Sequence, residues 1–195
     1  PAILWSAHAG LAVVAVAEGQ PDRAEQHFEA ALATVEQTRS DLLKADYRIS
    51  FLTRLIDFYR DYVDLLIDRG RVQQALAIVE SSRARVLAER HSVAVSDRPT
   101  SGAARRLAAE SDTVLLSYWL APARSYVWIV TADGVRGVPL PPASQIERLV
   151  DEHQAMIHNA LADPLAATLT PGDRLYDLLV KPISSSLRPG ASIVI

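Results

Sequence analysis

The chain has 195 residues, of which 49% are apolar and 22% are charged, so it has enough apolar material for one or two packed cores and is not a disordered chain. Its formal net charge of -3 provides no overall positive field for nucleic acid or an anionic membrane surface. The absence of cysteine excludes a disulfide scaffold, a thiolate metal site and a cysteine nucleophile within these residues.

The N-terminal residues 1–5 lack the basic start and small-residue cleavage site of a signal peptide. No run of about 18 uncharged apolar residues follows, so the sequence predicts a cytoplasmic protein without a membrane partner. An apolar helix follows Pro1 without a capping residue, and the last residues, 192–195, lie within an apolar run. We therefore expect the chain to be a fragment of a longer protein.

Residues 4–35 predict an antiparallel helical hairpin. Nearly every residue from 4 to 17 is apolar or small, and Gly19-Gln20-Pro21-Asp22 then supplies a helix-ending glycine, a proline suited to a first turn and an early acid. One apolar stripe at helical spacing marks the buried side of the second helix. It consists of Ala24, Phe28, Ala31, Leu32 and Val35.

Residues 45–87 predict a second, longer hairpin. Its apolar residues alternate at spacings of four and three between charged positions, so one seam should face other helices and the charges should face water. The chain reverses at residues 68–71, where we expect Gly70 to adopt a left-handed backbone. The seam consists of Ala45, Ile49, Leu52, Ile56, Tyr59, Val63 and Leu66, and the return helix carries Val72, Ala75, Leu76, Val79, Val86 and Leu87.

Both hairpins place a glycine five residues before an alanine and nine before a larger apolar residue, and this pattern resembles the tetratricopeptide repeat. The closing proline of that family is missing, and the interval of 51 residues between Ala24 and Ala75 exceeds the usual period of about 34. Residues 1–92 therefore resemble degenerate repeats with lengthened helices, which implies a protein partner bound by the helices. The matching residues are Ala12, Gly19, Ala24, Phe28 and Ala31 in the first unit, and Tyr59, Gly70, Ala75, Val79 and Ser82 in the second.

Residues 93–111 are predicted to be a linker that contains a short helix at 103–109, and the apolar period changes after it. Three runs of aromatic and β-branched residues follow, at 114–120, 126–130 and 135–140. A loop joins the first two, and Asp133-Gly134 marks a tight turn before the third. We expect three consecutive antiparallel strands.

Two further helices and a last strand complete the prediction. Residues 144–147 form a capping-box pattern that starts the first helix, and the second should start near Pro171 and bend or end at Pro182. The continuous apolar run at 193–195 is typical of a parallel strand buried on both faces. Residues 112–195 are thus predicted to be a truncated α/β domain, and the fold class of the chain is α plus α/β.

Four segments in order resemble the start of a CHAT domain behind its tetratricopeptide repeats. The CHAT family is a caspase-like domain found with such repeats, mostly in bacteria. The resemblance implies a parent cysteine peptidase that cleaves with a His and a Cys placed after successive core strands, both beyond residue 195. No catalytic residue, cofactor or metal is therefore assigned to this chain. The segments are residues 79–87, 116–118 with 126–134, 175–183 and 192–195.

The candidate metal and acid–base residues favour structural interpretations. His8, His27 and His91 are isolated in the sequence, and His153 and His158 stand five apart, so they do not share a helix face as metal ligands at i, i+4 would. The adjacent acids Asp151 and Glu152 diverge on a helix, which indicates a solvated face. No phosphate-binding glycine motif occurs.

An arginine cluster and four strand aromatics are also candidates for nucleic-acid contacts. The arginines more simply complement a helix end and nearby acids, and the aromatics alternate as core residues do, so a nucleic-acid partner is not expected. Three functions remain open: a non-catalytic, protein-binding fragment of a CHAT peptidase, a helical adaptor without an enzyme, and a nucleic-acid-linked regulator. We also expect self-association through the edge formed by residues 192–195. The cluster is Arg83, Arg85, Arg90, Arg105 and Arg106, and the aromatics are Tyr118, Trp119, Tyr126 and Trp128.

Overall fold

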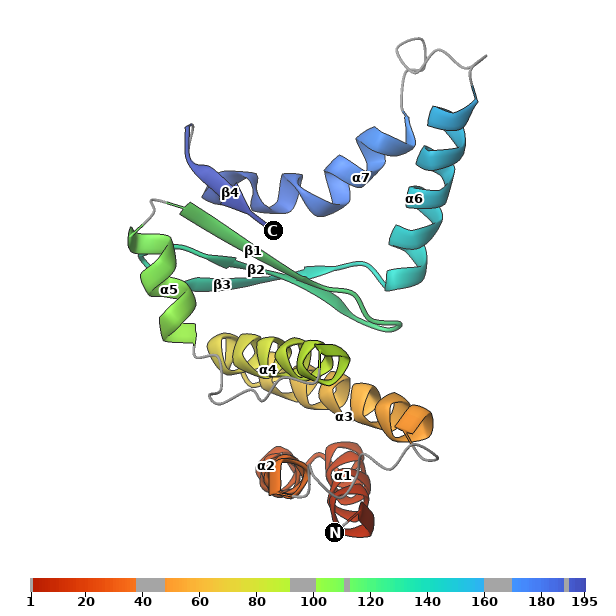
Figure 1. Ribbon diagram of the computed structural model, residues 1–195, viewed down its shortest axis with the longest axis vertical. Coiled ribbons are helices and arrows are strands. Elements are labelled where there is room, and N and C mark those ends of the chain that lie inside the picture. The colour runs from red at the N-terminus through yellow and green to blue at the C-terminus, as the bar shows by residue number, and fades with distance from the viewer. Residues whose placement is uncertain (1, 38–47, 92–100, 111–112, 160–169, 188–189) are drawn as a thin grey trace. The chain divides into compact units, whose positions relative to one another are not determined.

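The computed structural model describes residues 2–37, 48–91, 101–110, 113–159, 170–187 and 190–195. The chain divides into two compact units, Pro1–Pro99 and Thr100–Ile195 (Figure 1). The first unit is helical, and the second combines helices with a four-stranded sheet, so the α plus α/β class is confirmed at this level.

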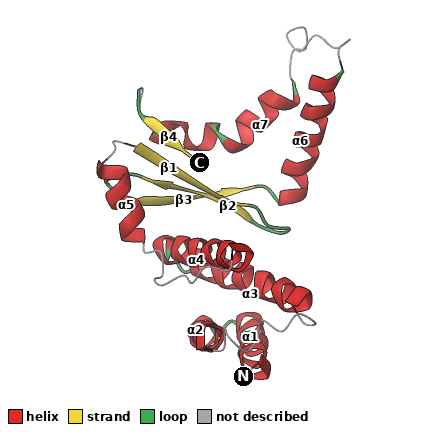
Figure 2. Ribbon diagram, in the orientation of Figure 1, coloured by secondary structure: helices red, strands yellow, loops and turns green. Residues whose placement is uncertain are grey.

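The first unit consists of two helical hairpins (Figure 2). Helix α1 (Ala2–Ala17) packs on α2 (Pro21–Gln37), and α3 (Arg48–Asp68) packs on α4 (Val72–His91). The predicted stripe on α2 is confirmed, since Ala24, Phe28 and Ala31 are completely buried and Leu32 and Val35 are nearly so. Apolar burial along this stripe is the main force that holds the hairpin closed.

The two hairpin turns have the same hydrogen-bonded geometry. Gly19 and Gly70 have φ angles of 69° and 70°, which confirms the left-handed backbone expected at Gly70. The amide of the next residue donates to a carbonyl five positions back, at 2.8 Å for both Gln20 to Ala15 and Arg71 to Leu66. This Schellman motif satisfies carbonyls that the helix end would otherwise leave unpaired, and it sets the direction of the return helix.

We expect Gly70→Val to destabilise the second hairpin by about 1–2 kcal/mol, because a β-branched residue is strained in the left-handed region. A Cβ at this position would meet no atom within 4 Å, so the cost is conformational and not a packing clash. Urea unfolding would measure the loss. Gly70→Asn is the matched control, since asparagine tolerates this backbone, and an equal loss in both variants would contradict the explanation.

The predicted seam of α3 is partly wrong. Tyr59, Val63 and Leu66 are buried as expected, but Ile56 is 41% exposed. Helix α3 contacts α1 and α2 as well as α4, so it buries a wider face than a single seam. The additional buried residues are Leu55, Phe58, Tyr62 and Leu65. Ala45 and the side chains of Ile49, Leu52, Val86 and Leu87 lie outside the described residues.

The second unit is built on a sheet with the strand order β3-β2-β1-β4. Strands β1 (Thr113–Trp119), β2 (Ser125–Val130) and β3 (Val135–Leu140) pair antiparallel in succession, whereas β4 (Ser192–Val194) pairs parallel to β1. The three predicted antiparallel strands and the parallel last strand are therefore confirmed. Helix α5 (Ser101–Glu110) contacts β1 and β2.

One face of this sheet forms a core with the helices that follow it. Residues of α6 (Ala143–His158), α7 (Pro171–Leu179) and the 3-10 helix Lys181–Ser186 pack there. The Tyr118 hydroxyl donates to the Leu179 carbonyl at 2.8 Å, and burial raises the pKa of this tyrosine. The buried core side chains are Val114, Leu116, Val127, Ile129, Leu140, Ile146 and Ile183.

The capping box predicted at residues 144–147 is wrong. Helix α6 begins at Ala143 after Pro142, so Ser144 already lies in the first turn and no side chain caps the helix. The capping box is instead on α7, where the Asp173 amide donates to Thr170 Oγ1 at 3.1 Å and the Thr170 amide donates to Asp173 Oδ2 at 2.8 Å. The hydrogen bonds that the Thr170 amide and hydroxyl donate to the Asp173 carboxylate lower the pKa of Asp173. The bend or end expected at Pro182 is confirmed, since α7 ends at Leu179 and the 3-10 helix Lys181–Ser186, which contains Pro182, follows it.

Strand β4 differs from its prediction in burial. Ile193, Val194 and Ile195 are 47%, 53% and 86% exposed, although the apolar run predicted a strand covered on both faces. Strand β4 lies at one end of the described strand order, with β1 as its neighbour. It therefore presents apolar side chains at an edge of the described sheet.

Candidate functional site

The sequence-predicted candidates for metal and acid–base chemistry remain dispersed in the second unit. His153 is half-buried on α6, and His158 is exposed with Nδ1 2.7 Å from the Gln154 carbonyl oxygen. Asp151 and Glu152 are exposed, as expected for a solvated face. Within the part of the chain that the structure describes, no group of three or more His, Asp or Glu residues is placed to hold a metal ion.

His8 and His27 are not isolated, contrary to the sequence interpretation. The hairpin brings His8 of α1 and His27 of α2 together, with their Nδ1 atoms 3.2 Å apart and their ring centroids 5.4 Å apart. The two residues are 19 positions apart in the sequence, and only the packing of two facing helices makes them neighbours.

The arginine cluster does not form a free basic surface among the residues described. Arg83 pairs with Glu80 at 2.8 Å, and Arg105 lies with Nη2 3.5 Å from the Ala132 carbonyl. Arg106 is exposed, and the side chains of Arg85 and Arg90 lie outside the described residues. The predicted core role is confirmed for Tyr126 and Trp128, which are 2% and 0% exposed, while Tyr118 and Trp119 are half-buried.

A groove of about 330 Å³ lies between α1 and α3 in the first unit. Its floor is aromatic, one wall consists of small residues of α1, and the other wall is the charged face of α3. Such a combination of apolar floor and few polar groups is typical of binding sites. The groove is lined by Trp5, Ser6, Ala9, Gly10, Val13, Phe28, Arg54, Asp57, Phe58 and Asp61.

The groove floor is a connected set of aromatic rings. Trp5 meets Phe58 edge to face, with ring centroids 6.2 Å apart and an interplanar angle of 84°. Phe28 lies 5.7 Å from Phe58 and stacks on Tyr62 at 4.9 Å. Because each ring is fixed by its neighbours, the floor is preorganised and a ligand need not order it.

The α1 wall allows a ligand to approach the helix backbone closely. Ser6, Ala9, Gly10 and Val13 follow one another at helical spacing, and none is larger than valine. A Cβ built on Gly10 would meet no atom within 4 Å, so the space beside this glycine is open.

The α3 wall carries two carboxylates, Asp57 and Asp61, and one cation, Arg54. Asp57, Asp61 and Asp64 recur at i, i+4 and i+7, and Asp57 also pairs with Arg60 at 2.9 Å. Burial, followed by the charges of Asp64 and Asp57, raises the pKa of Asp61. Arg60 opposes this rise, and a positive group bound in the groove would lie beside the Asp57 and Asp61 carboxylates.

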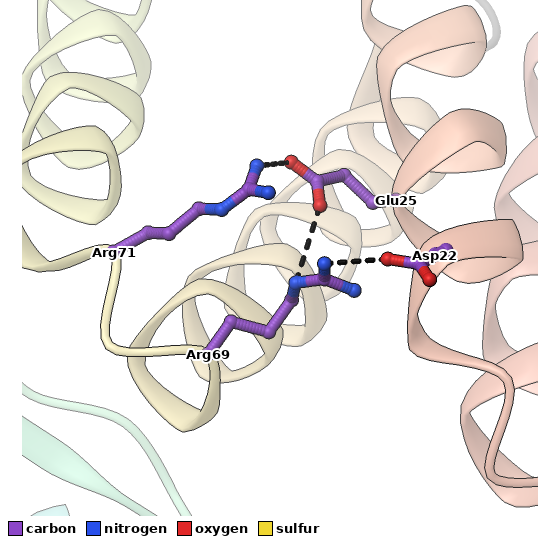
Figure 3. A network of polar contacts seen from close by, with 4 residues as sticks. All are labelled: Asp22, Glu25, Arg69 and Arg71. Atoms are coloured by element: carbon purple, nitrogen blue, oxygen red, sulfur yellow. Dashed lines mark hydrogen bonds and ion pairs between the residues drawn. The ribbon is translucent and has the colours of Figure 1, made fainter.

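A polar network fixes the two hairpins against each other (Figure 3). Arg69 Nη2 lies 2.5 Å from Asp22 Oδ1, and Arg69 Nε lies 3.3 Å from Glu25 Oε2. The other oxygen of Glu25 accepts a hydrogen bond from Arg71. The carboxylate of Glu25 is buried, and it lies at the start of α2 while both arginines flank the glycine turn between α3 and α4.

This network links the start of α2 to the turn between α3 and α4. Sequence reasoning missed it because Glu25 and Arg71 are 46 residues apart and no local pattern links them.

A second hollow of about 400 Å³ lies among α2, α3 and α4, and Glu29 is the one charged residue in its lining.

Comparisons of the chain with protein-family models, curated proteins and solved structures found no match in any of the three. Among the described residues, no helix is long and apolar enough to span a bilayer.

Proposed function

We propose that the helical half of this chain is a protein-interaction module that binds a peptide segment in the groove between α1 and α3. The observation that carries this proposal is the juxtaposition of an open space beside small residues of α1 with a wall of α3 on which two carboxylates outnumber one arginine. The complementary ligand is a segment with an apolar side chain for the open space beside Gly10, and a lysine or arginine placed against Asp61.

The second half belongs in this proposal to the first part of a CHAT-type, caspase-like domain. The succession of three antiparallel strands, two helices and a strand parallel to β1 supports it. Peptide-bond cleavage would then fall to a His and a Cys beyond residue 195, and the present chain would act in the cytoplasm through binding. A helical adaptor without peptidase activity is the alternative, and the same groove would serve it.

Gly10 offers a matched pair of variants for the groove. Gly10→Ala should raise the free energy of unfolding by about 0.5–1 kcal/mol, because alanine has the higher helix propensity and its Cβ meets open space. Chemical denaturation would measure the gain. A loss of stability would show that the space beside Gly10 is not open.

The binding proposal is tested by selecting peptides from a random displayed library on the whole chain. Selected peptides should be enriched in an apolar residue beside lysine or arginine, and Gly10→Trp should abolish their binding by filling the groove. Gly10→Ala should retain it. Selection of peptides that bind all three proteins equally would contradict the groove as the site.

We also propose that the chain associates with a second copy of itself through the outer edge of β4. An edge strand with exposed apolar side chains is a template for pairing with another chain. Light scattering over a concentration series should show growth beyond a monomer, and Val194→Lys should suppress that growth. A strictly monomeric wild-type chain at high concentration would exclude this association.

A further inference from the structure

The half-buried histidine pair at the interface of α1 and α2 is a second site with chemistry of its own. His8 and His27 come from facing helices, and their Nδ1 atoms lie 3.2 Å apart. Both residues are part of a hairpin whose turn is fixed by the Schellman motif at Gly19. The two nitrogens are therefore held together by the fold and not by local sequence.

The separation of the two nitrogens matches that of two ligands on one metal ion. At a metal–nitrogen distance of about 2.0–2.1 Å, two nitrogens 3.2 Å apart subtend about 100° at the ion, near the tetrahedral angle. Neutral imidazole is a ligand that Zn²⁺, Cu²⁺ and Ni²⁺ prefer, whereas Mg²⁺ and Ca²⁺ prefer oxygen.

We propose that His8 and His27 bind one imidazole-preferring divalent ion, with Zn²⁺ as the reference, through their two Nδ1 atoms. Water would occupy the remaining coordination positions, so the ion would be exchangeable. Arg23, one helical turn before His27, is the nearest cation along α2, and its Nη1 lies 3.2 Å from Gln20 Oε1, toward the turn. This site is separate from the groove and does not rest on the proposed function.

Binding at this position would join α1 to α2. In the unfolded chain the two histidines are 19 residues apart and no longer held at a ligand spacing, so the ion should bind the folded hairpin more tightly. The ion should therefore stabilise the folded state in proportion to its occupancy. Without metal, the same pair is satisfied by an N–H···N hydrogen bond in which one imidazole donates to the other.

Titration of the whole chain with ZnCl₂ tests the site. Calorimetry should show one ion per chain, and the thermal midpoint should rise by several degrees with Zn²⁺ but not with Mg²⁺. His8→Gln and His27→Gln should each weaken binding by at least about tenfold, because each removes one of two protein ligands. His158→Gln is the control, since that exposed histidine lies on α6.

A measurement on the unaltered chain keeps the test independent of folding in the variants. Nitrogen NMR of the imidazoles should show that Zn²⁺ shifts the Nδ1 resonances of His8 and His27 and leaves the other three histidines unchanged. The proposal is overturned if Zn²⁺ neither releases heat nor moves these resonances, or if His8→Gln and His27→Gln bind Zn²⁺ as the wild type does. In either case the pair would be a hydrogen bond alone.

Discussion

Phe28→Ala should lower the free energy of unfolding by about 3–5 kcal/mol, the largest loss expected from any single change in the helical unit. Phe28 is completely buried, stacks on Tyr62 at 4.9 Å and lies 5.7 Å from Phe58, so it joins the first hairpin to the second. Its removal leaves a cavity at the junction and also takes away part of the groove floor. Urea unfolding followed by circular dichroism would measure the loss.

The control for Phe28→Ala is Ile56→Ala on α3. Ile56 is 41% exposed, so its truncation should cost less than about 1 kcal/mol. Similar losses in both variants would show that the hairpins are not joined through the aromatic cluster.

Glu25→Gln should destabilise the chain by about 2–3 kcal/mol. The carboxylate is buried and contacts both Arg69 and Arg71, so its neutralisation leaves two guanidinium groups without their shared partner. We place the loss below the range for fully buried pairs because the Arg71 side chain is 40% exposed. Thermal or urea unfolding at low salt would measure it.

Asp22→Asn provides the matched control for Glu25→Gln, since Asp22 contacts Arg69 but its side chain is 84% exposed. It should cost less than about 1 kcal/mol. A double-mutant cycle with Arg71→Gln should also show coupling to Glu25. Equal losses at Asp22 and Glu25, or no coupling, would contradict the account of the network.

The features predicted correctly from the sequence are those that depend on neighbouring residues. Gly19 and Gly70 end their helices through hydrogen bonds within six residues, and the strands β1 to β3 follow from aromatic and β-branched runs separated by turns. The capping box illustrates the limit of such patterns, because Ser144 has the right residue type but Pro142 lies at the start of the helix.

The features that the sequence could not specify depend on which elements pack together. Phe58 is buried and Ile56 is not because α3 meets α1 and α2 as well as α4, and its rotation about its own axis is set by these contacts. The meeting of His8 with His27 and of Glu25 with Arg71 has the same origin. The resemblance to helical repeats implied a protein partner, but the groove follows only from the placement of three helices.

Hydrogen exchange of the whole chain with and without a selected peptide tests the binding account most directly. We expect the peptide to slow exchange in α1 between Ser6 and Val13 and in α3 between Arg54 and Asp61, and to leave the strands of the second unit unchanged. In the Gly10→Trp variant, addition of the peptide should no longer slow exchange in α1 and α3. Protection confined to residues 100–195, or spread equally over the chain, would contradict the assignment of the groove as the binding site.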